Sequence, residues 1–182
     1  MVPPLNRCYK SEMRVALILL AVGLLLPDAG SADSRDSRAL SFLSIHNGAR
    51  VDVVYWDSGT YVPEGLAVLN GFLRDRRTGD EHTIDPALFD LLHELRLPTG
   101  TREPFQVISG YRSPQTNARL QEQGRGVASG SLHMQGRAID IRLSDVPLTD
   151  LRDAALKLQR GGVGFYSASD FVHVDTGRVR QW

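Results

Sequence analysis

Two short stretches near the C-terminal end most constrain the fold, because each alternates aliphatic residues with groups that can bind a metal. In "AIDIRL" (residues 138–143), the isoleucines would share one face of a β-strand and Asp140 would lie on the other. In "FVHVD" (residues 171–175), the valines face one way and His173 faces the other. The alternation predicts two strands that bury their aliphatic faces in a core and present Asp140 and His173 on the opposite face.

A further histidine stands just before the first of these strands. In "SLHMQGRAIDI" (residues 131–141), Gly136 allows the backbone to fold back, so that His133 can approach Asp140. If the two strands pair, His173 joins them. Two imidazoles and one carboxylate with an open fourth position are typical of a catalytic zinc site, which activates water and polarises a carbonyl. The spacing alone also allows a structural histidine and an aspartate paired with a nearby arginine.

Composition indicates one compact domain with no net charge. The chain has 182 residues, 42% of them hydrophobic, and its 21 basic residues balance its 21 acidic ones. A net charge of zero gives no electrostatic argument for a nucleic-acid partner. The single cysteine, Cys8, precedes the apolar run described next, so the exported chain is expected to use oxygen and nitrogen ligands rather than thiolates.

The N-terminus has the pattern of a secretory signal peptide. Basic residues precede an unbroken apolar run, "VALILLAVGLLL" (residues 15–26), and small residues follow as far as Ala32. The run has 12 residues, fewer than the ~20 that span a bilayer as a helix. We therefore predict a signal peptide at 1–32, a linker at 33–39, and a single exported domain at 40–182. An uncleaved anchor in the inner membrane is the alternative.

Within the domain, hydrophobic periodicity and turn residues alternate between helical and extended patterns. Asn47-Gly48 predicts a β-hairpin between two short apolar alternations. These elements follow no strict βαβ rhythm, which indicates an α+β fold with a small antiparallel sheet and packed helices. Helices are expected within residues 63–76, 84–100, 113–124 and 147–162, and further strands at 105–109, 138–143, 162–166 and 171–175.

Three motifs in the order "SGYRS" (residues 109–113), "SLHMQGRAIDI" and "FVHVD" resemble the zinc D-Ala-D-Ala peptidase superfamily. The stretches "GVGFY" and "HVDTGRVRQW" are similar to its murein endopeptidase K group. The resemblance covers residues 40–182. It implies the hedgehog/DD-peptidase-like fold, one zinc ion per chain and peptidoglycan as the partner.

The resemblance also implies roles for individual residues. His133, Asp140 and His173 match the zinc ligands of the superfamily. Arg112 matches an arginine near the scissile carbonyl, where a guanidinium can bind the developing oxyanion or a substrate carboxylate. Ser131 matches a serine that contacts substrate, and it could equally cap a turn.

The catalytic base is open between two aspartates. Many relatives carry an acidic residue three positions before the last histidine ligand, and Asp170 occupies that position. A carboxylate there could accept a proton from water and pass it to the leaving amine. Asp175 shares a strand face with His173, and could act as the base or orient that histidine. We favour Asp170.

These features predict a periplasmic zinc metallopeptidase that hydrolyses peptide cross-links or stem peptides of peptidoglycan through a metal-activated water. A D,D-carboxypeptidase that trims terminal D-Ala is one alternative. A non-catalytic, zinc-containing module that binds the cell wall is another. The sequence leaves open whether cleavage is internal or terminal, and whether the bond is D,D or L,D.

Overall fold

The computed structural model describes residues 37–124 and 126–182. The predicted signal peptide and most of the predicted linker lie outside these residues. The first strand, β1 (Arg38–Ser44), begins inside the stretch expected to be linker, so the ordered domain starts two residues before residue 40. None of the helices in the described part of the chain is both long and apolar enough to cross a membrane.

The strands form one eight-stranded sheet in the order β3-β2-β1-β4-β5-β7-β6-β8. This confirms the α+β class, but the sheet is larger than expected and mixed, because β1 pairs with β4, and β6 with β8, in parallel. The first parallel pair is possible because two helices connect its strands. The remaining strands are β2 (Arg50–Asp57), β3 (Thr60–Tyr61), β4 (Phe105–Ser109), β5 (Ala138–Arg142), β6 (Gly162–Tyr166), β7 (Phe171–Asp175) and β8 (Arg180–Gln181).

The helices start where the sequence places proline and capping residues. Asp85 accepts a hydrogen bond from the backbone N–H of Ala87, and Ser113 accepts one from that of Thr116, which satisfies free N–H groups of the first turn. The helices are α1 (Pro63–Phe72), α2 (Pro86–Thr99), α3 (Pro114–Glu122) and α4 (Leu148–Leu158), with single 3₁₀ turns η2 (Leu132–Gln135) and η3 (Ser167–Ser169).

Helix α1 ends at Phe72, four residues before the expected end at Arg76. The chain turns there because the carboxylate of Asp75 accepts a hydrogen bond from the backbone N–H of Arg77 at 2.8 Å. Gly79, with a φ of +80°, completes the turn. This loop runs toward the functional site described below.

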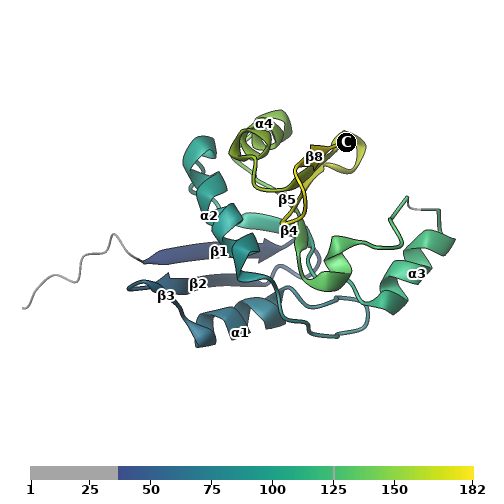
Figure 1. Cartoon of the computed structure of the whole chain (residues 1–182), viewed down its shortest axis with the longest axis horizontal. Coiled ribbons are helices and arrows are strands. Elements are labelled where there is room, and N and C mark those ends of the chain that lie inside the picture. The colour runs from purple at the N-terminus through teal and green to yellow at the C-terminus, as the bar shows by residue number, and fades with distance from the viewer. Residues whose placement is uncertain (1–36, 125) are drawn as a thin grey trace, which may run out of the picture. The chain divides into compact units, whose positions relative to one another are not determined.

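Helices α2 and α4 contact each other and cover aliphatic side chains of the sheet (Figure 1). The core is continuous from β2 to β6, and aromatic rings fill its N-terminal half, where Phe42 lies between Phe72 and Phe105. Fully buried side chains of the core include Leu40, Phe42, Tyr55, Leu69, Leu88, Phe89, Leu92, Leu95, Ile139, Ile141, Leu151 and Val172.

The pairing of β5 with β7 fixes the face on which the polar residues meet. The strands are antiparallel, and Asp140 lies directly opposite His173. Ile139 and Ile141 are fully buried in the core on the other face. The predicted alternation of both strands is confirmed, and the register brings the two polar residues together as neighbours across the ladder.

Asp90 links helix α2 to the first strands of the sheet. Its carboxylate accepts hydrogen bonds from Arg38 at 2.8 Å, Tyr55 at 3.1 Å and Tyr61 at 2.6 Å. Burial, together with the charge of Asp90, raises the pKa of Tyr55, so this hydroxyl remains a donor at neutral pH. The interaction fixes one end of α2 against the sheet.

We expect Asp90→Ala to lower the free energy of unfolding by about 1–3 kcal/mol, because the buried Tyr55 hydroxyl loses its acceptor. Urea unfolding followed by circular dichroism measures the change. Asp52→Ala removes an aspartate–arginine pair on the solvent face of the same sheet and should cost less than about 1 kcal/mol. Equal losses in the two variants would contradict the role of Asp90. Adding Tyr55→Phe to Asp90→Ala should restore part of the loss.

Candidate metal centre

Three sequence-predicted ligands meet at one point of the sheet. Nε2 of His133 lies 3.2 Å from Oδ1 of Asp140, and Nδ1 of His173 lies 2.9 Å from the same oxygen. The two ring nitrogens are 3.2 Å apart. All three side chains are buried, with 2–8% of their surface exposed. Among the described residues, they form a group of three that could hold a metal ion.

The outer nitrogen of each ring faces a hydrogen-bond acceptor. Nδ1 of His133 donates to the carbonyl of Gly110 at 2.7 Å, and Nε2 of His173 donates to Oδ2 of Asp175 at 3.0 Å. These partners place the protons of neutral rings on the outer nitrogens and leave lone pairs on the inner ones. Two lone pairs and a carboxylate oxygen then converge on one point, and this arrangement requires a positive charge between them.

The spacing fits a tetrahedral cation. Zinc–nitrogen and zinc–oxygen bonds of about 2.0–2.1 Å place neighbouring ligand atoms about 3.3 Å apart in a tetrahedron. The three separations of 2.9–3.2 Å are close to that value. Burial lowers the pKa of His173, but hydrogen bonds to Asp140 and Asp175 outweigh it and raise the pKa. The site therefore favours positive charge, as a proton or as a metal ion.

The 3₁₀ turn η2 holds His133 in position. Gly136 ends the turn with a φ of +65°, and a Cβ atom at this residue would lie 2.3 Å from the carbonyl oxygen of Thr83. The backbone N–H of Asp85 donates to the carbonyl of Gly136 at 2.9 Å. Glycine is thus required here both for its backbone conformation and for the close approach of two chain segments.

Asp175 lies behind His173, away from the open side of the site. It is fully buried, and its oxygens accept hydrogen bonds from His173, Arg180 and the backbone N–H groups of Gly162 and Gly177. Burial would raise its pKa, but these hydrogen bonds outweigh burial and hold the pKa well below the usual range. Asp175 is therefore a fixed anion that orients the His173 ring.

Arg112 enters the site from the loop after β4. Its side chain is 9% exposed, and Nη2 lies 3.6 Å from Oδ2 of Asp140, which is a long ion pair. Its Nε is buried without a hydrogen-bond partner among the described residues. Burial also lowers the pKa of Arg112. A guanidinium with unused donors beside the metal ligands can bind an oxygen atom of a substrate.

Ser131 lies at the start of η2 and lines the same cleft, but its hydroxyl does not cap the turn. The turn-capping role that the sequence also allowed for Ser131 is therefore not seen in the structure. The hydroxyl can donate to, or accept from, a molecule in the cleft.

Asp75 anchors the segment that carries Arg112. Its Oδ2 accepts hydrogen bonds from the backbone N–H of Ser113 at 2.8 Å and from its hydroxyl at 2.7 Å. Burial would raise the pKa of Asp75, but hydrogen bonds from Thr116, Ser113 and the backbone N–H of Arg77 lower it to about 2. A carboxylate of the first loop thus fixes the residue next to Arg112.

The structure does not bring Asp170 to the metal ligands. It follows η3 in the left-handed conformation, with a φ of +54°, and its side chain is 63% exposed. Its Oδ2 accepts a hydrogen bond from Nη1 of Arg142 at 2.5 Å. Asp170 is absent from the described residues that line the cleft, where Asp140 has the only side-chain carboxylate. The predicted base is therefore engaged elsewhere in this arrangement.

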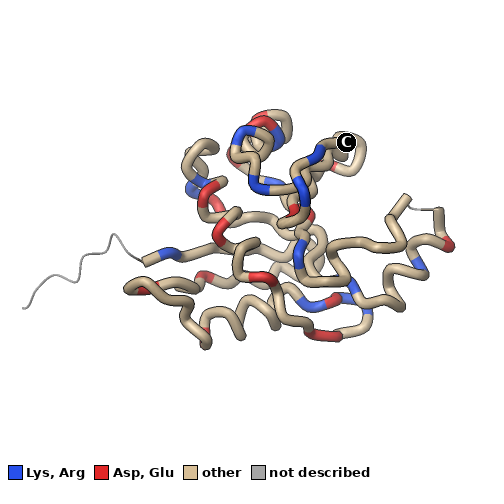
Figure 2. The backbone as a smooth tube through the Cα atoms, in the orientation of Figure 1, with Lys and Arg blue, Asp and Glu red and all other residues tan. Residues whose placement is uncertain are grey.

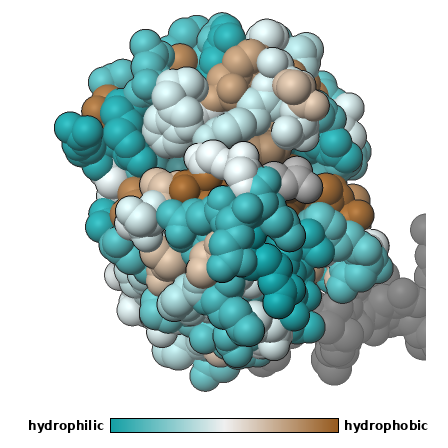
Figure 3. Space-filling view, turned by 90° about the vertical axis from the view of Figure 1, so that its right-hand side faces the viewer, coloured by the Kyte–Doolittle hydropathy of each residue, from teal (hydrophilic) through white to brown (hydrophobic). Residues whose placement is uncertain are grey.

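The three candidate ligands lie in an open cleft of about 570 Å³, which is in the range of small-molecule sites. Figure 3 shows a groove across this face of the molecule, with apolar residues gathered along it. Several lining residues escaped the sequence analysis, namely His46, Arg76, Arg77, Tyr166, Phe171 and Trp182. Among them, only the two adjacent basic residues Arg76 and Arg77 form a pattern that could be noticed in the sequence.

Trp182 forms the wall beside His173. The two ring centroids are 5.2 Å apart, and the indole N–H donates to the Tyr166 hydroxyl at 2.8 Å. Gly164 permits this packing, because a Cβ there would lie 2.7 Å from the indole. The aromatic wall shields one side of the His173 ring from water.

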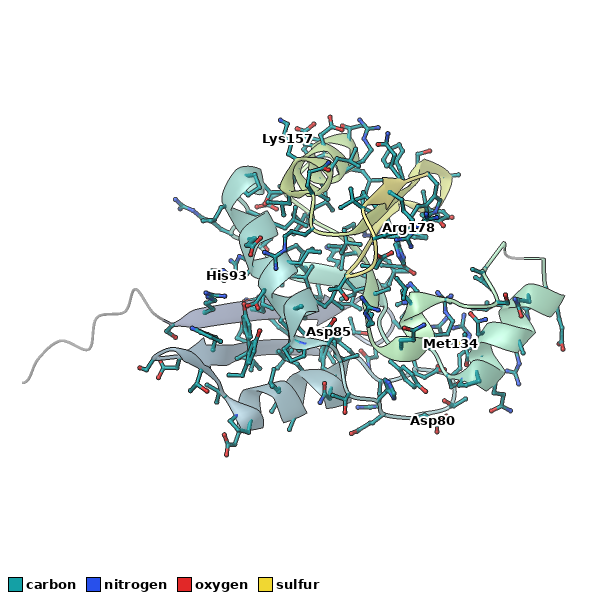
Figure 4. All side chains as sticks on the ribbon, in the orientation of Figure 1. Asp80, Asp85, His93, Met134, Lys157 and Arg178 are labelled. Carbon is teal, nitrogen blue, oxygen red and sulfur yellow. The ribbon has the colours of Figure 1, made fainter. Side chains whose placement is uncertain are left out.

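The other histidines lie outside the metal group. His82 stacks on Tyr111, with ring centroids 4.8 Å apart, and His46 contacts the carbonyl of Ile108 at the cleft margin. Figure 4 shows His93 beside α2, on the other side of the view from Met134, the neighbour of His133. His46 is the one of the three that lines the cleft.

This α+β fold, with a buried His-Asp-His group on the floor of an open cleft, is the arrangement of a metal-dependent hydrolase. Residues 32–182 match the family described as "Peptidoglycan L,D-endopeptidase MepK". The chain belongs to this family, which confirms the predicted superfamily and its murein endopeptidase K group.

Two relatives show the extent of the similarity. The peptidoglycan L,D-endopeptidase MepK of Escherichia coli (strain K12) is 45% identical over 145 residues, which cover 80% of each chain. The probable peptidoglycan L,D-endopeptidase MepK of Haemophilus influenzae is 42% identical over 146 residues, which cover 80% of this chain and 78% of the relative.

We expect Asp75 to contribute stability that depends on pH. Its pKa of about 2 in the folded state lies below the ordinary value of 3.8, so its contribution is complete above pH 3.8 and disappears as the pH falls through 2. Between about pH 5 and about pH 3, wild type should lose about 1 kcal/mol more than Asp75→Asn. Urea unfolding at a series of pH values measures this. The exposed Asp57→Asn is the control, and parallel curves for wild type and Asp75→Asn would contradict the assignment.

Proposed function

We propose that this protein is a zinc-dependent peptidoglycan L,D-endopeptidase with a hedgehog/DD-peptidase-like fold. The observation that carries the proposal is the convergence of two imidazole lone pairs and one carboxylate oxygen, 2.9–3.2 Å apart, on the floor of an open cleft. Membership of the endopeptidase family supports the choice of peptidoglycan as substrate and of an internal L,D bond. The carboxypeptidase and the non-catalytic module are the alternatives that the experiment below distinguishes.

His133, Asp140 and His173 would hold the zinc ion. A zinc ion held there acts as a Lewis acid that polarises a carbonyl and makes water a stronger nucleophile at neutral pH. The chain's own contribution is orientation, because Gly110 and Asp175 fix the two imidazole rings through their outer nitrogens. The aromatic wall at Trp182 limits the access of water to one side of the site.

Arg112 and Ser131 are proposed to bind the substrate. The buried, incompletely paired guanidinium of Arg112 can donate to the scissile carbonyl oxygen and stabilise the negative charge that develops on it. Such donors typically contribute about 10²–10³-fold to the rate. The Ser131 hydroxyl, at the start of the turn that carries His133, can fix the peptide next to this bond.

Both candidates for the proton acceptor already accept hydrogen bonds from other residues. Asp175 has its oxygens occupied behind His173, and Asp170 pairs with Arg142 outside the cleft. Asp170 can serve as the base only if it leaves Arg142, and Asp175 only if it gives up its hydrogen bonds. We therefore propose Asp175 as the residue that positions His173, and retain Asp170 as the candidate base.

We also propose that the protein acts in the periplasm. The peptidoglycan substrate lies outside the cytoplasm, and the apolar run at residues 15–26 is suited to export. The chain is then secreted after removal of a signal peptide, or remains anchored by it.

The function is tested with purified protein and defined cross-linked muropeptides, whose products are identified by mass. With zinc, we expect internal cleavage of the cross-link at an L,D bond. A chelator should abolish cleavage, and added zinc should restore it. His133→Ala should remove activity and zinc binding but keep the circular dichroism spectrum. Release of terminal D-alanine alone would instead establish the carboxypeptidase, and unchanged muropeptides would contradict a catalytic role.

Two matched substitutions separate the aspartates. Asp175→Asn should lower the affinity for zinc by about 10–100-fold, because His173 loses a charged acceptor. Asp170→Asn should leave zinc affinity at the wild-type value and, if Asp170 is the base, lower kcat. Competition with a chromogenic chelator measures the affinity, and steady-state cleavage measures kcat. Wild-type kcat in Asp170→Asn would remove this residue from the mechanism, and wild-type zinc affinity in Asp175→Asn would contradict its positioning role.

A further inference from the structure

The metal-binding cleft has a local excess of positive charge, although the chain as a whole is neutral. Figure 2 shows acidic and basic residues interspersed along the described chain. The described residues that line the cleft include four arginines but a single side-chain carboxylate, that of Asp140, which belongs to the candidate metal group. The four are Arg76, Arg77, Arg112 and Arg180.

Two of these arginines have partners in the site, and two do not. Arg180 pairs with Asp175 at 2.7 Å, and Arg112 lies 3.6 Å from Asp140. Arg76 and Arg77 are exposed, and their side chains have no ion pair or hydrogen bond with any residue that the structure describes. Two guanidinium groups without a direct partner among the described residues therefore line the cleft.

Asp75, the adjacent acidic residue in the sequence, makes no ion pair with either arginine. Asp75 is 2% exposed, and its oxygens already accept hydrogen bonds from Ser113 and from the backbone N–H of Arg77. The same bonds fix the backbone of the loop, so the two arginines extend from an anchored segment. Burial lowers the pKa of Arg77, and the positive charges of Arg76, Arg112 and Arg119 lower it further, which the charge of Asp75 opposes.

The arginine pair lies toward one end of the cleft. A smaller cavity of about 40 Å³ adjoins it, and Arg76, Arg77 and Arg112 line both. The metal ligands His133, Asp140 and His173 line the cleft alone. A peptide that crosses the metal would thus extend past Arg112 toward Arg76 and Arg77.

We propose that Arg76 and Arg77 form an anion-binding subsite, which takes a free carboxylate of the peptide substrate at a distance from the scissile bond. This inference rests on the proposed function and names the chemistry of the preferred substrate. Guanidinium groups bind carboxylates through paired, charge-assisted hydrogen bonds, so a free carboxylate is preferred over a neutral carboxamide. Arg112 then acts at the bond that is cleaved, and the arginine pair selects and orients the peptide.

The test uses cross-linked muropeptides in which one free carboxylate at a time is converted to a carboxamide. For the zinc-loaded wild type, amidation of one particular carboxylate should lower kcat/KM by about tenfold or more. In the double variant Arg76→Gln/Arg77→Gln, the ratio between the free and amidated peptides should fall toward one. Because this ratio compares two peptides cleaved by the same variant, it does not change when part of the protein is inactive.

Arg102→Gln provides the matched control. Arg102 is an exposed arginine before β4, whereas the cleft lies at the opposite, C-terminal end of that strand. This variant loses the same type of charge and should keep the wild-type ratio. The ratio of wild type should also fall at high salt, because exposed charges are screened.

The subsite and the proposed function fail in different ways. Equal cleavage of the free peptide and every amidated peptide by wild type would overturn the subsite and leave the endopeptidase intact. The same preference in the double variant as in wild type would also overturn it. If no peptide is cleaved, the proposed function fails, and calorimetric dissociation constants of the same peptides decide the subsite. A weaker affinity for one amidated peptide, lost in the double variant, would support it, and equal affinities would overturn it.

Discussion

The antiparallel register between β5 and β7 is the constraint on which the functional site depends. It places Asp140 opposite His173 and sends the neighbouring isoleucines and valines into the core. Because side chains alternate along a strand, a shift of one residue would exchange the two faces, bury a histidine or an aspartate in the core and place aliphatic residues in the cleft. The packing of the hydrophobic core therefore also specifies the position of the candidate metal ligands, since the same strand pairing satisfies both.

Around this pair, the site is assembled from segments far apart in the sequence, each held by a specific contact. A left-handed glycine turns the chain after His133, and Asp75 ties the first loop to the segment of Arg112. A buried carboxylate at Asp175 orients His173. These contacts involve backbone groups and carboxylates whose oxygens already accept hydrogen bonds. We therefore expect them to keep their geometry when substrate enters.

Local patterns predicted much of this arrangement. Strand alternation was sufficient to place Asp140 and His173 on one face, and the glycine at position 136 explained how His133 could join them. Alternation could not predict where the Asp170 side chain lies, because this residue adopts a left-handed conformation outside the strand. The same pattern placed Asp175 on the correct face but could not show that its oxygens were already occupied.

Long-range proximity accounts for the rest. Arg76 and Arg77 follow a helix that ends earlier than its periodicity indicates, and tertiary contacts such as that between Asp75 and Ser113 bring their loop to the cleft. The parallel pairing of β1 with β4 likewise joins strands that are separated in the sequence by two strands and two helices. Neither feature leaves a periodic signal in the amino-acid sequence.

The buried guanidinium of Arg112 has a consequence for how this fold can evolve. This guanidinium carries a charge that is removed from water and an Nε–H without a partner, and both lower the stability of the free protein. An apolar side chain of similar size would pack there at lower cost, so selection for stability alone would remove the arginine. Its presence marks a position where the protein gives up stability in favour of binding, and a ligand that supplies the missing acceptor should raise the melting temperature.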